Sequence, residues 1–314
     1  MSQTSAPATS VSLDSSSRDR WLVWAALFSL YIIWGSTYLG IRYAVETIPP
    51  MLMNASRFLL AGFLLYGFLR ARGAQNPTPR QFWNAGLVGV ILICGGNGFV
   101  TLAEHSGVPS GIAATAVASV TIWTGLWSGL WGQWPRKLEW LGVAVGFVGV
   151  VILTLEGNLR TNPFGLIVFC APICWSFGSI LSRNIQMPQG LMASAIEMIV
   201  AGFVSIPIGL LLGERITQMP STSSLLATGY LITFGSLIGF NAYIFVLGKV
   251  RPTLATSYAY VNPVVALFLG VAIGGEKLGA NALVALPIIL LGVAVIAWAQ
   301  NVPRHQSDAP KEIT

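Results

Sequence analysis

Charged residues are scarce in this sequence. Only 9% of the 314 residues are Asp, Glu, Lys or Arg, 54% are hydrophobic, and the mean hydropathy is +0.71. A soluble domain carries about 25% charged residues, many of them on its hydrated surface. Because so few charges cannot cover a soluble core of this size, the composition excludes a large soluble helical protein and indicates an integral membrane protein.

Cysteine and histidine are scarce too, with three and two residues. Cys170 and Cys174 are four residues apart, but no His or third Cys lies near them in the sequence, and Cys94 is far away. Small buried cysteines in apolar helices are the commoner case. His105 is expected in a loop and His305 in the C-terminal tail, and no Gly-x-x-x-x-Gly-Lys-Ser/Thr phosphate loop is present. We therefore expect no metal, no cofactor and no enzymatic activity.

Long apolar runs, in contrast, are abundant. A helix of about 20 apolar residues spans the bilayer core, which is about 30 Å thick. The runs do not alternate in the way that strands of a transmembrane β-barrel do. They predict an all-α membrane protein with ten transmembrane helices between disordered cytoplasmic tails at 1–20 and 301–314. The ten runs cover roughly residues 22–44, 51–71, 82–104, 109–131, 138–156, 164–183, 188–213, 223–247, 253–273 and 280–299.

Positive charges gather on one side of the predicted membrane. With a cytoplasmic N-terminus, twelve Lys and Arg residues are inside and three are outside. Cytoplasmic loops are enriched in Lys and Arg, so both termini are predicted to be cytoplasmic, and the net charge of +6 reflects topology rather than nucleic-acid binding. The inside residues are Arg18, Arg20, Arg70, Arg72, Arg80, Arg136, Lys137, Arg183, Lys249, Arg251, Arg304 and Lys311. The outside residues are Arg160, Arg215 and Lys277.

The sequence contains an internal repeat. Residues 31–42 and 172–183 are similar, and in each a Trp precedes an Arg by eight residues. Further matches follow in the same order at offsets between 140 and 143 residues, which indicates two homologous halves at 21–157 and 158–300. The matching pairs include Trp34 and Trp175, Arg42 and Arg183, Ala61-Gly62-Phe63 and Ala201-Gly202-Phe203, and Lys137-Leu138 and Lys277-Leu278.

Each half contains five predicted helices, which is an odd number. The second half must therefore enter the membrane in the opposite direction, so the two halves form an inverted-topology repeat. In transporters, such repeats place the substrate site near the bilayer midplane between the halves and permit alternating access. This architecture favours a transporter over a channel, a receptor or a membrane enzyme.

Aromatic and polar residues are predicted near the middle of the membrane. Trp34, Trp123 and Trp175 lie about 11 to 13 residues into their helices, roughly 16–20 Å deep at 1.5 Å per residue. Their faces suit apolar and cationic groups, although helix packing would also use them. We expect Trp34, Trp175 and Tyr258 to border a central cavity. The candidate substrate-binding residues are Trp34, Tyr38, Asn97, Trp123, Trp175, Ser179, Asn241, Ser257, Tyr258, Tyr260 and Asn262.

Asn97 belongs to a glycine-rich segment, Gly95–Gly98, in the middle of the third predicted helix. Glycines in a membrane helix allow neighbouring backbones to approach or the helix to unwind where it faces protein or water. Asn241 occupies the equivalent region of the eighth helix. Both amides either bind substrate or bridge helices.

Four charged residues lie within or at the ends of predicted helices. Glu197 is near the midplane of the seventh helix and Arg57 is nearer the outer face of the second, at corresponding positions of the repeat. Intramembrane charges are functional candidates. Glu197 is interpreted as a proton-coupling carboxylate, an ammonium counter-ion or a structural partner. Arg42 and Arg183 either snorkel to the interface or act as gates.

Three motifs and a loop carry a family resemblance. The motifs are Trp34-Gly35-Ser36-Thr37-Tyr38, Glu104-His105-Ser106-Gly107-Val108-Pro109-Ser110-Gly111 and the stretch from Ala255 to Ala266, and the loop contains Glu276-Lys277. With these the chain resembles the EamA family of the drug/metabolite transporter superfamily, and within it the YedA/YddG-like exporters of bacterial inner membranes. The resemblance implies a basket of ten helices that exports amino acids, aromatic ones included, and related metabolites. The small proton antiporters of that superfamily use an acid in the first helix, and residues 22–44 contain none.

The sequence thus predicts a multi-pass inner-membrane secondary transporter that exports amino acids and small metabolites by alternating access. Its expected partners are a small-molecule substrate and the lipid bilayer, with no nucleic acid. Glycine spacings such as Gly142 to Gly146 leave a monomer and a homodimer open. The alternatives are a proton-coupled multidrug exporter and, in another class, a non-transporting membrane receptor or scaffold.

Overall fold

The computed structural model describes residues 17–108, 110–154, 167–274 and 280–301, and the regular elements in these ranges are all helices. The predicted all-α class is confirmed. The first helix begins at Ser17, so residues 17–20 are helical rather than part of a tail. The rest of that predicted tail, and all but Asn301 of the C-terminal one, lie outside the described residues.

Consecutive helices combine into ten segments across the described bundle. Long apolar helices that fit a bilayer include Arg20–Ala44, Pro50–Ala71, Pro79–His105, Leu191–Leu211 and Thr222–Lys249. The first half contains α1 (Ser17–Ala44), α2 (Pro50–Ala71), α3 (Pro79–Gly89), η1 (Val90–Asn97), α4 (Gly98–His105), α5 (Ser110–Ala118), α6 (Val120–Leu130) and α7 (Lys137–Thr154). The second contains α8 (Cys170–Asn184), α9 (Leu191–Leu211), α10 (Thr222–Tyr230), η3 (Leu231–Phe240), α11 (Asn241–Lys249), α12 (Pro252–Ala255), α13 (Tyr258–Gly274) and α14 (Ala280–Asn301).

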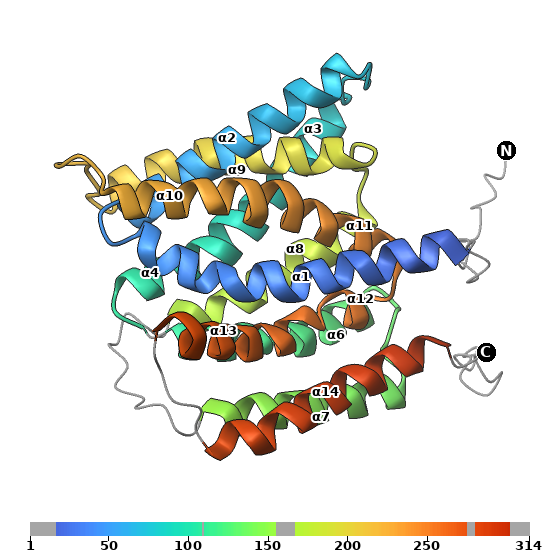
Figure 1. The fold of residues 1–314 in the computed structure, drawn as a ribbon. Coiled ribbons are helices and arrows are strands. Elements are labelled where there is room, and N and C mark those ends of the chain that lie inside the picture. The colour runs from blue at the N-terminus through green and yellow to red at the C-terminus, as the bar shows by residue number, and fades with distance from the viewer. Residues whose placement is uncertain (1–16, 109, 155–166, 275–279, 302–314) are drawn as a thin grey trace, which may run out of the picture.

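The two halves pack on each other with reciprocal contacts. Helices α2 and α9 lie side by side (Figure 1). A Cβ atom at Gly62 would lie 2.7 Å from the Ile199 side chain, and one at Gly202 would lie 2.7 Å from the Leu59 side chain. Each residue of the second contact is the repeat equivalent, at an offset of 140, of one in the first. A contact accompanied by its own equivalent is what a two-fold arrangement requires, and it agrees with the predicted inverted repeat.

Two segments of the bundle are π-helical rather than α-helical. They are η1 in the third spanning segment and η3 in the eighth, so they occupy equivalent places in the two halves. The glycine-rich run before Asn97 therefore widens the helix and does not unwind it. Asn97 ends η1, and Asn241 directly follows η3. Short π-helical segments occur frequently at functional sites, and both of these face the centre described below.

The ends of the bundle agree with an even number of crossings. In Figure 1, α1 begins and α14 ends on the same side. The α7–α14 pair forms one edge of the bundle and the α2–α9 pair the opposite edge, with α1, α8 and α13 between them. The spacing from Gly142 to Gly146 is used inside the chain, because both glycines pack against α14.

Candidate functional site

Four aromatic side chains from both halves meet in the centre of the bundle. The ring of Trp34 lies 5.4 Å from that of Trp175, 5.2 Å from that of Tyr243 and 4.7 Å from that of Tyr258, measured between centroids. Trp175 also lies 5.5 Å from Tyr243. These separations are in the range of favourable edge-to-face and tilted aromatic pairs. We call Trp34, Trp175, Tyr243 and Tyr258 the aromatic cluster.

Each tryptophan of the aromatic cluster packs on a π-helical segment of the opposite half. A Cβ atom at Gly96 in η1 would lie 2.6 Å from the Trp175 ring, and one at Gly239 in η3 would overlap the Trp34 ring. Only glycine leaves room for such an approach. The Trp34 indole N–H donates a hydrogen bond to the Gly235 carbonyl of η3, at 3.1 Å. The repeat thus fixes both tryptophans in reciprocal positions.

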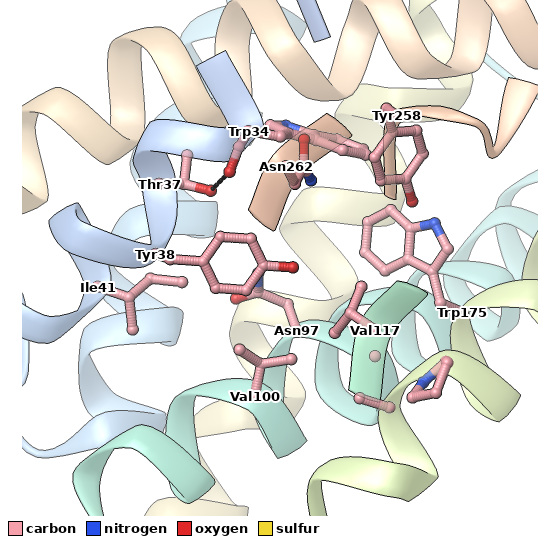
Figure 2. A pocket seen from close by; sticks show the side chains of 13 residues that line it. Trp34, Thr37, Tyr38, Ile41, Asn97, Val100, Val117, Trp175, Tyr258 and Asn262 are labelled. Atoms are coloured by element: carbon pink, nitrogen blue, oxygen red, sulfur yellow. Dashed lines mark hydrogen bonds between the residues drawn. The ribbon is translucent and has the colours of Figure 1, made fainter. Parts of the chain in front are cut away.

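A cavity of about 60 Å³ lies beside the aromatic cluster. Figure 2 shows Tyr38, Asn97 and Asn262 around it, with the Tyr258 hydroxyl near the Trp175 indole nitrogen. The space exceeds the roughly 10–15 Å³ that one water needs, but it is smaller than the roughly 300–1,000 Å³ of ligand pockets. A substrate therefore requires the helices around the cavity to move apart. The lining residues are Trp34, Thr37, Tyr38, Ile41, Gly96, Asn97, Val100, Val117, Ala171, Pro172, Trp175, Tyr258 and Asn262.

Some predicted site residues do not line this cavity. Trp123 stacks on Trp127, with ring centroids 6.5 Å apart. The Asn241 amide nitrogen donates to the Leu237 carbonyl at 2.7 Å, and the Tyr260 hydroxyl donates to the Val143 carbonyl at 3.0 Å. Ser179 and Ser257 bond backbone carbonyls of their own segments and the hydroxyls of Tyr243 and Tyr31. These five residues contact their own or neighbouring helices, whereas Trp34, Tyr38, Asn97, Trp175, Tyr258 and Asn262 line the cavity.

The two ends of the site differ. Along α1 the lining residues run from Trp34 toward Arg42, so the cavity lies on the Arg42 side of the aromatic cluster. On the other side, Arg183 donates hydrogen bonds to the carbonyls of Leu247 and Val250, at 2.6 and 2.9 Å. The side chain of Arg42, its repeat equivalent, donates no hydrogen bond within the described part of the chain. Arg183 thus joins α8 to the end of α11, whereas at the Arg42 end the Glu214 carboxylate accepts hydrogen bonds from the Met51 and Leu52 backbone N–H groups.

A second set of hydrogen bonds joins helix ends on the Arg183 side. The buried Glu139 carboxylate at the start of α7 accepts hydrogen bonds from Arg251 at 2.8 Å and from Thr253 at 2.6 Å. The Arg136 backbone N–H also donates to it, at 2.7 Å. This carboxylate links the α6–α7 connection to the beginning of α12.

The two intramembrane charges do not contact each other or the cavity. Arg57 is buried and donates from Nε to the Ser236 hydroxyl in η3, at 2.8 Å. Glu197 is fully buried, and neither of its carboxylate oxygens has a hydrogen-bond partner among the described residues. A Cβ atom at Gly89, next to η1, would overlap the Glu197 backbone. Each of these two residues therefore lies against or beside a π-helical segment of the opposite half.

Two residues of this region were missed by the sequence prediction. Tyr243 completes the aromatic cluster and is fully buried. It lies two residues after Asn241, in a short apolar stretch that gives no signal of its face. Glu104 lies one turn beyond Val100 on α4 and is also buried. Glu104 begins one of the family motifs noted above. Nothing in the sequence, however, indicated a partner for it or its depth in the bundle.

A bundle of ten spanning segments in two inverted halves, with an aromatic cavity between them, defines a multi-pass membrane transporter. The chain belongs to the EamA-like transporter family, whose sequence model matches residues 20–155 and 164–298. The predicted family is confirmed.

Relatives agree with this class. The chain is 49% identical over 275 residues to the "uncharacterized inner membrane transporter YedA" of Escherichia coli (strain K12), covering 87% of this chain and 90% of the relative. It is 23% identical to a "probable amino-acid metabolite efflux pump" of Salmonella typhimurium, covering 87% and 94%. A solved crystal structure superposes with a TM-score of 0.72 at 21% identity, covering 92% of this chain and 100% of the other, which supports the fold.

Proposed function

We propose that this protein is a secondary transporter that exports amino acids, aromatic ones included, and related small metabolites by alternating access. The observation that carries the proposal is the cavity between the halves, bordered by Trp34, Trp175 and Tyr258 and flanked by Asn97 and Asn262. Aromatic faces accept apolar side chains and ammonium groups. Amides bind carboxylates and other polar groups. The Salmonella relative's name, an amino-acid metabolite efflux pump, supports this substrate class.

The asymmetry of the two ends supports alternating access. The cavity lies on the Arg42 side of the aromatic cluster, which fits one of the two states that an inverted repeat permits. The charge distribution supports a cytoplasmic location for the termini, and with them for the Arg183 end. The cavity of the described conformation then lies on the outward side of the aromatic cluster.

Reconstituted flux tests the proposal directly. Vesicles containing the protein and loaded with labelled Phe or Thr are expected to release label faster than protein-free vesicles. Flux at the protein-free rate for a panel of amino acids would contradict the proposed substrate class.

Replacing Trp175 with Ala is expected to raise the dissociation constant for Phe about tenfold. An aromatic contact contributes about 0.5–1.5 kcal/mol beyond its buried area, and about 1.4 kcal/mol is a tenfold change in affinity. Calorimetric titration of the purified protein measures the effect. Trp123→Ala is the matched control, because Trp123 does not line the cavity. Equal losses in both variants would remove Trp175 from the site.

Replacing Arg183 with Gln is expected to weaken the tie at that end and to lower transport about fivefold. A hydrogen bond from a charged donor contributes about 1.5–3 kcal/mol when buried, and the partial exposure of Arg183 reduces this. Spin labels at Asn184 and Lys249, introduced after Cys94, Cys170 and Cys174 are replaced, should report longer distances. Arg42→Gln should leave that distance unchanged. An unchanged distance in Arg183→Gln would exclude a gate there.

A proton-coupled exporter is the second candidate, and Glu197 is the observation that favours it. Its carboxylate is fully buried without a hydrogen-bond partner in the described ranges. Such an acid is a common proton carrier in membrane transporters. This candidate predicts that efflux follows an imposed pH gradient and that Glu197→Gln removes the dependence. Efflux that ignores the gradient in the unmodified protein excludes it.

A further inference from the structure

Glu104 is an acidic side chain near the cavity that the proposed transport cycle does not yet use. Asn97, Val100 and Glu104 follow one another at spacings of three and four residues, so they share one stripe of the third spanning segment. Asn97 and Val100 both line the cavity (Figure 2). Glu104 is the next position of this stripe, one turn farther toward the Arg42 end.

The Glu104 carboxylate is buried and unsatisfied. The residue is 9% exposed, and neither oxygen has a hydrogen-bond partner among the described residues. A buried carboxylate without donors costs free energy, because it has lost its hydrogen bonds to water and forms none with the protein. Glu139 and Glu214 show the contrast, since each accepts several hydrogen bonds at a helix end. Glu104 is therefore a buried acceptor without a donor in the described ranges, one turn beyond residues that line the cavity.

The charged surroundings of Glu104 indicate which donor fits. Arg42 and Tyr38 are close enough to interact with it electrostatically, but no ion pair joins Glu104 and Arg42. Arg42 is exposed, while Glu104 is buried. An acidic and a basic side chain thus lie at the same end of the site, and the aromatic cluster lies at the other.

We propose that Glu104 binds the ammonium group of the substrate, with the substrate's apolar side chain on the aromatic cluster and its carboxylate on the Arg42 side. The proposal rests on the proposed function and specifies its substrate class as zwitterionic or cationic amines with an aromatic or apolar side chain. It distinguishes such amines from organic acids that have the same side chain.

Three ligands that share one side chain test this assignment. They are Phe, phenethylamine, which lacks the carboxylate, and 3-phenylpropionate, which lacks the ammonium group. In calorimetric titrations of the full chain, Glu104→Gln should lower the affinity for Phe and phenethylamine about tenfold or more. It should leave the affinity for 3-phenylpropionate unchanged. A hydrogen bond to a charged group contributes about 1.5–3 kcal/mol, which corresponds to roughly ten- to a hundredfold in affinity.

Matched variants separate binding from structure. Glu46→Gln removes an exposed carboxylate near the same end and should leave all three affinities unchanged. Glu104→Asp keeps the charge and should keep the preference for phenethylamine over 3-phenylpropionate, which tests the proposal even where Glu104→Gln does not fold.

The outcomes distinguish the two proposals. Suppose that the unmodified protein binds Phe, and that Glu104→Gln leaves the affinity for all three ligands unchanged or lowers it equally for all three. The role of Glu104 is then overturned, while the proposed function stands. If the unmodified protein binds neither Phe nor phenethylamine, the proposed function itself fails.

Discussion

Replacing Glu139 with Ala is expected to lower the free energy of unfolding by about 3 kcal/mol. This carboxylate is fully buried and accepts from Arg251, Thr253 and the Arg136 backbone. Removing one partner of a buried ion pair costs about 3–5 kcal/mol. The lower end applies here, because the Arg251 side chain keeps 29% of its exposure. Thermal unfolding of the purified protein in detergent measures the change.

The control for Glu139 is a glutamate whose side chain has no partner among the described residues. Glu46 lies exposed between α1 and α2, so Glu46→Ala should change the midpoint of unfolding by little. Because Glu139 ties the helix ends on the Arg183 side, Glu139→Ala should also lengthen the distance between labels at Asn184 and Lys249. A midpoint equal to that of Glu46→Ala would show that the buried carboxylate contributes no stability.

Glu139 illustrates what the sequence could not reveal. Its partners Arg251 and Thr253 stand 112 and 114 residues away, and nothing in the local pattern around Lys137 indicates them. The helices themselves could be predicted, because a lipid-facing segment must be long, apolar and helical whatever it packs against. Hydropathy therefore identified the segments that later hold Trp34, Trp175 and Tyr258, and the repeat related the two halves.

The candidate site, too, could be predicted from the sequence only in part. Depth in the membrane and position in the repeat placed Trp34 and Trp175 correctly beside each other, since a two-fold axis brings equivalent residues together. Where a whole helix is apolar, the sequence does not show which face of the helix a residue occupies. Tyr260 and Asn262 are two residues apart on α13, yet Tyr260 bonds the Val143 carbonyl of α7 and Asn262 lines the cavity.

The π-helical segments add a reason for such errors. A π-helical turn inserts an extra residue relative to an α-helix, so it rotates everything after it around the helix axis. Asn97 ends η1 and Asn241 directly follows η3, yet Asn97 lines the cavity and Asn241 bonds the Leu237 carbonyl in its own segment. An ideal helical wheel drawn through η1 or η3 assigns faces wrongly, and no pattern in the sequence marks the extra residue.

Replacing Gly292 with Leu is expected to prevent the protein from folding, and this is the largest effect that the structure predicts. A Cβ atom at Gly292 would lie 2.5 Å from the backbone nitrogen of Gly146 and 2.9 Å from the Gly142 carbonyl oxygen. The obstacle is backbone, so α7 and α14 would have to separate. Overpacking costs about 1–3 kcal/mol for small insertions and more for large ones. Detergent extracts should contain little monodisperse Gly292→Leu protein in size-exclusion chromatography.

A sharper test is whether Gly292→Ala raises or lowers the unfolding midpoint. Gly67 provides the matched control. Gly67 lies inside α2, and a Cβ atom there would have no neighbour within 4 Å. Gly67→Ala should stabilise the helix by up to about 1 kcal/mol, because Ala is the better helix former. The same propensity acts at Gly292, so a lower unfolding midpoint for Gly292→Ala can come only from the contact between α7 and α14. A raised midpoint in both variants would mean that these backbones are not in contact.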